Sequence, residues 1–194
     1  MRHRIWDLCK MLHNPRKVEI LLHIYDAEDG VLSVGELAHY MEERGVKLSG
    51  VSQYLKQFEA LGLILRERAG KFVYYHADLS GASREVREVA QMVRSRHETG
   101  GDMSFLDSFK VLMNPFRARL ANYLYHGGDG RIETICRTMD CDMAHFSRDV
   151  RTGVEAGMFA HEGGWGGTLR LIMPNDEIVR KVIEASPWRA DVRK

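Results

Sequence analysis

The sequence contains an internal repeat of about a hundred residues. Seven residues recur at a constant offset of 100 positions: Lys10, Leu12, Asn14, Pro15, Tyr25, Asp29 and Gly30 correspond to Lys110, Leu112, Asn114, Pro115, Tyr125, Asp129 and Gly130. The offset then falls to 95, so that Ser52 matches Ser147, Lys56 matches Arg151 and Gly62 matches Gly157. Two copies of one small domain explain such a repeat most simply. We therefore predict two domains, residues 1–99 and 100–194.

Composition supports two packed domains and excludes several classes of protein. The 194 residues suffice for two small domains, and a hydrophobic content of 44% is typical of folded chains. No apolar run approaches the ~20 residues of a membrane span, and residues 1–10 lack a secretory signal, so we expect a cytoplasmic protein that does not contact membranes. Three cysteines are too few for a disulfide framework. With a net charge of +1, nucleic-acid binding would require a local basic patch.

Local signals predict three helices at the start of the first copy. Residues 1–13 form a short helix, and Pro15 then opens a mostly apolar helix that runs to Tyr25. Ser33 and Glu36 have the spacing of a capping box, which starts the next helix. These helices precede the segment with the clearest functional pattern.

A further helix is predicted over residues 50–61, with Ser49 as its capping residue. Its inner stripe consists of four apolar residues: Val51, Leu55, Phe58 and Leu61. Its outer stripe consists of polar and charged residues: Ser52, Gln53, Lys56 and Gln57. Residues 63–76 then alternate as a β-hairpin that turns at Ala69-Gly70. Two helices joined by a turn and followed by a hairpin describe a winged helix-turn-helix, the hairpin being the wing.

These residues resemble a known family. The run Val51-Ser52-Gln53-Tyr54-Leu55-Lys56-Gln57-Phe58-Glu59-Ala60-Leu61-Gly62-Leu63-Ile64, followed by Arg66, Arg68, Gly70, Lys71 and Tyr74-Tyr75, is similar to the recognition helix and wing of ArsR-type transcriptional regulators. The resemblance extends over about residues 15–78, and Ser49-Gly50 stands where the family often has a small polar or proline pair. It implies a DNA-binding regulator, usually a repressor, that forms a two-fold dimer.

The chemistry of the outer stripe supports contact with double-stranded DNA independently. The amides of Gln53 and Gln57 can bind base edges, and Ser52 and Tyr54 can reach phosphates. Between residues 44 and 71 there are six basic and two acidic side chains. The basic ones are Arg44, Lys47, Lys56, Arg66, Arg68 and Lys71. The predicted DNA-binding residues are Ser49, Gly50, Ser52, Gln53, Tyr54, Lys56, Gln57, Arg66, Arg68 and Lys71; an ordinary solvated helix and hairpin is the alternative.

The second copy keeps the predicted elements but loses their positive charge. Residues 142–171 hold three basic and four acidic side chains, and the tip of the second wing, residues 163–167, is uncharged. Asp149 replaces Tyr54, and an acidic residue on a helix that faces the groove would be repelled by phosphate. We therefore predict a degenerate winged helix that serves dimerisation, docking or sensing. The predicted fold class is mainly α with small β-hairpins, in two tandem winged helix-turn-helix domains.

Metal and enzyme functions have weaker support. The metal-sensing patterns of ArsR relatives are missing, because the helix over 33–43 has no cysteine and His97 stands alone in residues 82–98. Cys136, Cys141 and His145 leave a metal site open in the second copy, although a structural zinc site needs four ligands. No catalytic constellation is evident, and the glycines of 163–167 lack the lysine and helix start of a P-loop. We expect no enzyme, no cofactor and no metal.

Two questions remain open at this level. A single DNA-reading copy per chain favours a homodimer on a palindromic site, but the two copies could also pair within one chain. The rival function is a tandem winged-helix scaffold that binds partner proteins, as in chromosome-segregation or complex-assembly subunits. The near-neutral charge favours the scaffold, and the basic patch of the first copy opposes it.

Overall fold

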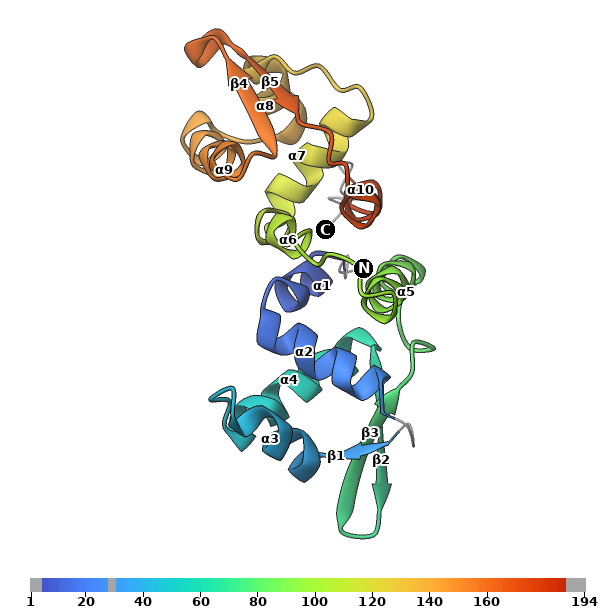
Figure 1. Cartoon of the computed structure of the whole chain (residues 1–194). Helices are drawn as coiled ribbons and strands as arrows, with labels where there is room; N and C mark the ends of the chain where they lie inside the picture. The colour runs from blue at the N-terminus through green and yellow to red at the C-terminus, as the bar shows by residue number, and fades with distance from the viewer. Residues whose placement is uncertain (1–4, 28–30, 188–194) are drawn as a thin grey trace. The chain divides into compact units, whose positions relative to one another are not determined.

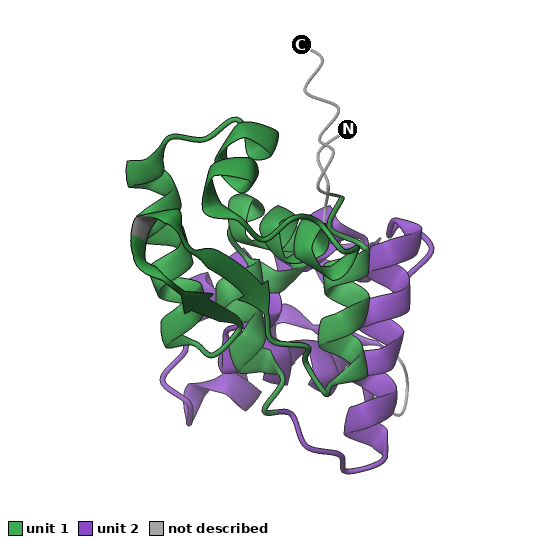
Figure 2. Cartoon of the chain, turned by 90° about the horizontal axis from the view of Figure 1, so that it is seen from above, with its two compact units in different colours: residues 1–10, 104–194 green, residues 11–103 purple. Residues whose placement is uncertain are grey.

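The computed structural model describes residues 5–27 and 31–187, except the side chain of Trp165. This part of the chain is mainly helical, with two small antiparallel sheets, as the sequence predicts. Contacts divide the chain into two units (Figure 2). Residues 11–103, purple and labelled unit 2 in the figure, come first in the chain and are called the first unit here; residues 104–194 together with the residues up to Lys10, green and labelled unit 1, are called the second unit. The sequence-based division instead placed the residues up to Lys10 with the first copy. Within the described ranges, no helix is both long and apolar enough to cross a membrane.

The first helices of the chain end where local sequence signals predict, and the first of them crosses the division between the units at Lys10 (Figure 1). Helix α1 covers Ile5–Leu12, and α2 covers Pro15–Tyr25. The Asn14 side chain caps α2 by accepting hydrogen bonds from two backbone N–H groups. Helix α3, Val34–Glu42, starts with the predicted capping box of Ser33 and Glu36, in which both reciprocal hydrogen bonds are present.

Helix α4, Leu48–Leu61, starts earlier than predicted. The extended residue before it is Lys47, whose side chain makes no capping hydrogen bond, so the prediction that Ser49 caps this helix is wrong. The buried Val46 donates its backbone N–H to the Met41 carbonyl and so closes the end of α3. The Lys47 carbonyl then accepts from the backbone N–H groups of Gly50 and Val51, which starts α4 and leaves Ser49 inside its first turn. The predicted inner stripe of α4 is confirmed, because all four apolar residues are buried.

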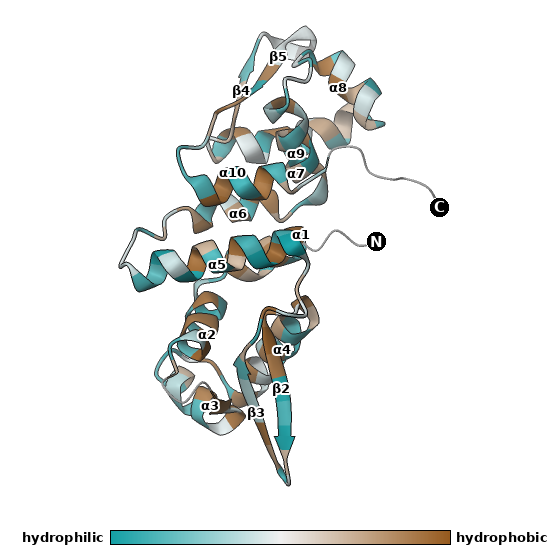
Figure 3. Cartoon of the chain, turned by 90° about the vertical axis from the view of Figure 1, so that its right-hand side faces the viewer, coloured by the Kyte–Doolittle hydropathy of each residue, from teal (hydrophilic) through white to brown (hydrophobic). Residues whose placement is uncertain are grey.

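Strands β2 (Ile64–Ala69) and β3 (Phe72–Ala77) form the predicted hairpin, paired from Ile64 with Ala77 to Ala69 with Phe72. The two-residue strand β1, Leu32–Ser33, adds to β3 and was not predicted, because two residues show no strand periodicity. Figure 3 shows strand β2 as largely hydrophilic, consistent with an exposed strand. Helix α5, Arg84–Glu98, completes the unit and buries an apolar stripe of Val86, Val89, Ala90 and Val93.

The second unit repeats the order of the helices and the hairpin, but only an isolated bridge between Arg131 and Thr168 stands in place of strand β1. Helices α6 (Leu106–Leu112), α7 (Pro115–Tyr125), α8 (Ile132–Met139) and α9 (Met143–Glu155) precede a hairpin of β4 (Phe159–Glu162) and β5 (Thr168–Leu171). The strands are joined by the 3₁₀ turn η1, Gly164–Gly166. The amphipathic helix α10, Glu177–Glu184, follows and was not predicted. Helix α10 buries one apolar face, as α5 does. Both helices follow the hairpin of their copy in the chain order.

One exchange of large and small residues shows how the second copy repacks. Phe58 of α4 corresponds to Gly153 of α9, and Ile64 of β2 corresponds to Phe159 of β4. A Cβ atom on Gly153 would lie 2.2 Å from the Phe159 ring, which is fully buried. The aromatic ring has therefore moved from the helix to the strand while the space between them stays filled.

Candidate nucleic-acid interface

The outward face of α4 presents the polar residues that the helical period predicts. Gln53 and Lys56 are exposed and Ser52 is half-buried, on the side of the helix opposite Val51 and Leu55. Gln53, Lys56 and Ser52 together supply one amide, one ammonium and one hydroxyl group, and the exposed Glu59 adds a carboxylate near the C-terminal end of the helix. The amide, ammonium and hydroxyl groups can bind base edges and phosphates.

The β2–β3 hairpin presents a second row of cations. Arg66 and Arg68 lie two residues apart on exposed strand β2, so they project from one face of the strand. Arg68 Nε donates to the Gly70 carbonyl at 3.1 Å, and Lys71 Nζ lies 5.3 Å from the centre of the Phe72 ring. These contacts hold the two cations at the hairpin turn, where Gly70 has a φ of +62°.

The charges of this surface are free. In the described part of the chain, none of Lys56, Arg66, Arg68 and Lys71 has a carboxylate within ion-pairing distance. Arg44 belongs to the same basic segment of the sequence, but its charge is paired. Its guanidinium pairs with Glu19 and stacks on Tyr40 at 4.3 Å, and this hydrogen bond to Glu19 is the main reason its pKa is raised. We define the four unpaired cations and Gln53 as the basic face.

Tyr54 and Gln57 lie against α2 and not on the open side of α4. Lys17 Nζ donates to Gln57 Oε1 at 2.9 Å and lies 5.4 Å from the centre of the Tyr54 ring. Burial lowers the pKa of Lys17. A bidentate contact with adenine needs both the oxygen and the nitrogen of an amide, and Lys17 already engages the oxygen of Gln57. Gln53 is therefore the better placed of the two glutamines for base contact.

The N-terminal end of α4 holds residues with mixed exposure. Ser49 is exposed in the first turn, and Gly50 is half-buried against Val46. Leu48, which sequence analysis did not select, is 57% exposed at the helix start. An apolar side chain in this place is suited to the methyl group of thymine. The sequence could have indicated this exposed position only by a leucine at the start of the helix, and a leucine there is equally compatible with a buried core residue.

In the second unit, Arg117 stands at the position of Lys17 and pairs with a carboxylate in place of neutral groups. Asp149, which replaces Tyr54, accepts hydrogen bonds from Arg117 Nη1 and Asn114 Nδ2, each at 3.2 Å. The side chains of Arg117 and Asp149 are only 10% and 21% exposed. Burial lowers the pKa of Arg117, and Asp149 opposes that shift. The expectation that Asp149 repels phosphate from an open helix face is therefore wrong, because its charge is balanced by Arg117 inside the unit.

We expect Arg117→Met to lower the free energy of unfolding of the second unit by about 2–4 kcal/mol, because it leaves Asp149 partly buried without its cation. The double variant Arg117→Met/Asp149→Leu should regain much of this loss. The matched control is Lys17→Met in the first unit, which leaves only neutral partners and should cost about 1 kcal/mol or less. Urea unfolding followed by circular dichroism measures each value. Strictly additive effects of the two substitutions would contradict the coupling.

Cys136 and Cys141 lie with Met143 in a sulfur cluster at the junction of α8 and α9. The Cys136 thiol contacts Met143 Sδ at 3.3 Å. Burial, and then neighbouring Cys136, raise the pKa of Cys141 to about 12, which disfavours the thiolate that a metal requires. His145 Nδ1 lies 2.6 Å from Asp142 Oδ2, the carboxylate that caps α9. A search of the described residues finds no group of three side chains arranged to hold a metal ion.

Comparison of the chain with protein-family models, with curated proteins and with solved structures finds no match in any of the three.

Proposed function

We propose that the chain is a sequence-specific, double-stranded DNA-binding transcriptional regulator, a repressor of the ArsR type, built from two tandem winged helix-turn-helix domains. Helix α4 is the recognition helix, and the β2–β3 hairpin is the wing. The observation that supports this most directly is the basic face, whose four cations have no carboxylate partner among residues 5–27 and 31–187, although the chain has a net charge of only +1. Unpaired cations around an exposed amide suit phosphates flanking a base edge.

Each part of the basic face has a defined role in this proposal. Gln53 contacts a base edge in the major groove, with Ser52 and Lys56 on adjacent phosphates. The wing places Arg66, Arg68 and Lys71 on the backbone beside the groove. Leu48 adds an apolar contact at the N-terminal end of the recognition helix. A homodimer would present two such faces to a palindromic site, since two-fold protein symmetry matches two half-sites.

The first test compares binding of the full chain to a duplex from its own upstream region and to a random duplex, across a salt series. Specific binding should be at least about a thousandfold tighter than non-specific binding. Lys56→Ala should weaken binding to both duplexes and lower the slope of log K against log salt by about 1. Arg148→Ala, an exposed cation of α9, is the control and should change neither quantity appreciably. Equal, weak and salt-independent binding to both duplexes would overturn the proposal.

A tandem winged-helix scaffold for partner proteins is the second candidate. Ile172 and Met173 favour it, because these neighbouring apolar side chains after β5 are 48% and 53% exposed. The same salt series separates the candidates. A scaffold has no reason to release phosphate counterions, so its DNA binding would be weak and would respond little to salt.

A further inference from the structure

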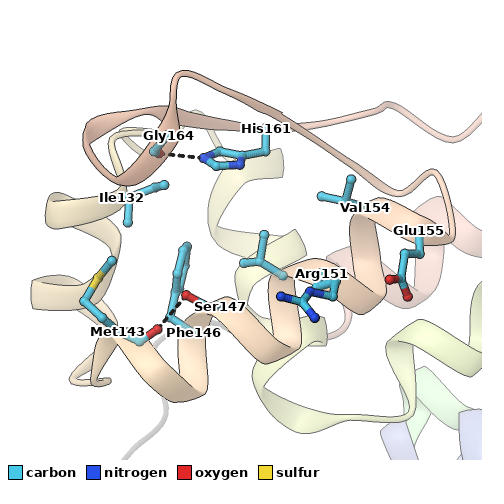
Figure 4. Close-up of a pocket in the computed structure, with 10 residues that line it drawn as sticks. Ile132, Met143, Phe146, Ser147, Arg151, Val154, Glu155, His161 and Gly164 are labelled. Carbon is cyan, nitrogen blue, oxygen red and sulfur yellow. Dashed lines mark hydrogen bonds between the residues drawn. The ribbon is translucent and has the colours of Figure 1, made fainter.

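The second unit contains a pocket between α9 and the hairpin of β4, η1 and β5. Its volume is about 460 Å³, within the usual range of small-molecule sites. Figure 4 shows side chains from α8, α9 and β4, together with the backbone of Gly164 in η1, around one space. The apolar part of the lining consists of Ile132, Met143, Phe146, Val150 and Val154.

Comparison of the two copies shows that this lining has lost charge. At the offset of 95, Val154 stands for Glu59 of α4, and His161 stands for Arg66 of β2. The helix and the hairpin of the first copy each carry a charged side chain at these positions, whereas the second copy has one apolar side chain and one imidazole. The Val154 side chain is 38% exposed, so it is not part of the buried core. It forms an apolar wall of the pocket that solvent can reach.

The polar groups of the pocket differ in what they can still bind. Ser147 Oγ donates to the Met143 carbonyl at 2.8 Å, and His161 Nε2 donates to the Gly164 carbonyl at 3.0 Å. Arg151 is exposed and, within the described residues, has no carboxylate at ion-pairing distance. Its guanidinium extends toward the Ser147 side of the pocket, whereas the Glu155 carboxylate lies beyond it at the C-terminal end of α9 (Figure 4). The pocket therefore combines an apolar wall with one unused cationic donor.

We propose that this pocket binds a small organic anion with an apolar body, such as an aromatic carboxylate or sulfonate. The apolar body contacts Phe146, Val150 and Val154, and the anionic group pairs with Arg151, which can offer two parallel N–H donors to it. The Ser147 hydroxyl keeps its acceptor lone pairs for a donor on the ligand. In the first unit Glu59 stands where the second unit has Val154, so the corresponding position carries a charge in place of an apolar side chain.

Two fluorescent probes that differ only in charge test this site on the full chain. One is 8-anilinonaphthalene-1-sulfonate, and the other is N-phenyl-1-naphthylamine, which has the same rings without the sulfonate. We expect saturable binding of one sulfonate probe per chain. Arg151→Gln should weaken the sulfonate probe about tenfold, as expected for loss of a charged hydrogen bond, and leave the neutral probe unchanged. Val154→Glu should weaken both probes by tenfold or more.

Arg148→Gln is the matched control, since it removes a cation of the same helix outside the pocket and should leave both affinities unchanged. Circular dichroism of each variant must match that of the native chain, because unfolded or loosened proteins also bind these dyes. Absence of saturable binding by the folded chain would overturn the site. Equal effects of Arg151→Gln on both probes, or none on either, would overturn the anionic class of ligand. DNA binding does not enter these measurements, so the site and the proposed function can fail separately.

Discussion

Neutralising the wing through Arg66→Gln/Arg68→Gln/Lys71→Gln is expected to weaken DNA binding about a hundredfold at ~0.15 M salt. All three side chains are exposed, and none has an ion-pair partner in the part of the chain that the structure describes, so each is available to displace a counterion from a phosphate. A slope of about −0.9 for each phosphate gives each contact a factor of roughly five at this salt concentration. Three lost contacts multiply to the expected factor, and the salt slope should become shallower by about 3.

The control for this variant must remove the same net charge elsewhere. Arg84→Gln/Arg137→Gln/Arg170→Gln does so with three exposed arginines outside the basic face. Arg84 and Arg170 already pair with Glu88 and Glu162. We expect this control to lower affinity by no more than a few-fold, through the weaker long-range field alone. Equal losses in the two triple variants would mean that net charge, and not the wing, attracts DNA. Filter-binding or anisotropy titrations across a salt series give both quantities.

Gly62→Ala is expected to destabilise the first unit by about 3 kcal/mol or more, the largest stability effect that we anticipate from a single methyl group. Gly62 ends α4 with a φ of +71°, a conformation that costs an L-residue about 1–2 kcal/mol. Steric overlap adds to that cost. A Cβ atom here would lie 2.3 Å from the Gly81 carbonyl carbon and 2.5 Å from the Ala82 nitrogen. Both are backbone atoms, which cannot rotate away as a side chain can.

The repeat supplies a control for this prediction. Gly157 follows α9 at the matching position with the same φ of +71°, but no heavy atom lies within 4 Å of its Cβ position. Gly157→Ala should therefore show only the conformational cost of about 1–2 kcal/mol. Hydrogen exchange resolved by peptides reports each unit separately in the full chain. Similar losses for the two substitutions would mean that residues 81 and 82 can move away at little cost.

Much of the candidate site follows from local sequence. The helical period alone places Val51 and Leu55 inward and Gln53 and Lys56 outward, because neighbours three and four residues apart share a face. The charged run Arg66-Glu67-Arg68 likewise predicts an exposed strand, and all of β2 after Ile64 is exposed. Gln57 follows the same period, yet its amide is engaged by Lys17, forty residues earlier in the chain. No local pattern contains that information, since the contact exists only after α2 packs against α4.

The second copy shows the same division. The sequence alone determined the repeat, the helices opened by Asn14-Pro15 and Asn114-Pro115, and the capping box at Ser33, because each signal lies within one or two turns of chain. Only the tertiary structure decided that Arg117 neutralises Asp149, that Phe159 fills the space over Gly153, and that α9 and its hairpin enclose a pocket. A side chain's free energy depends on which partner and how much water surround it, and packing between distant segments sets both.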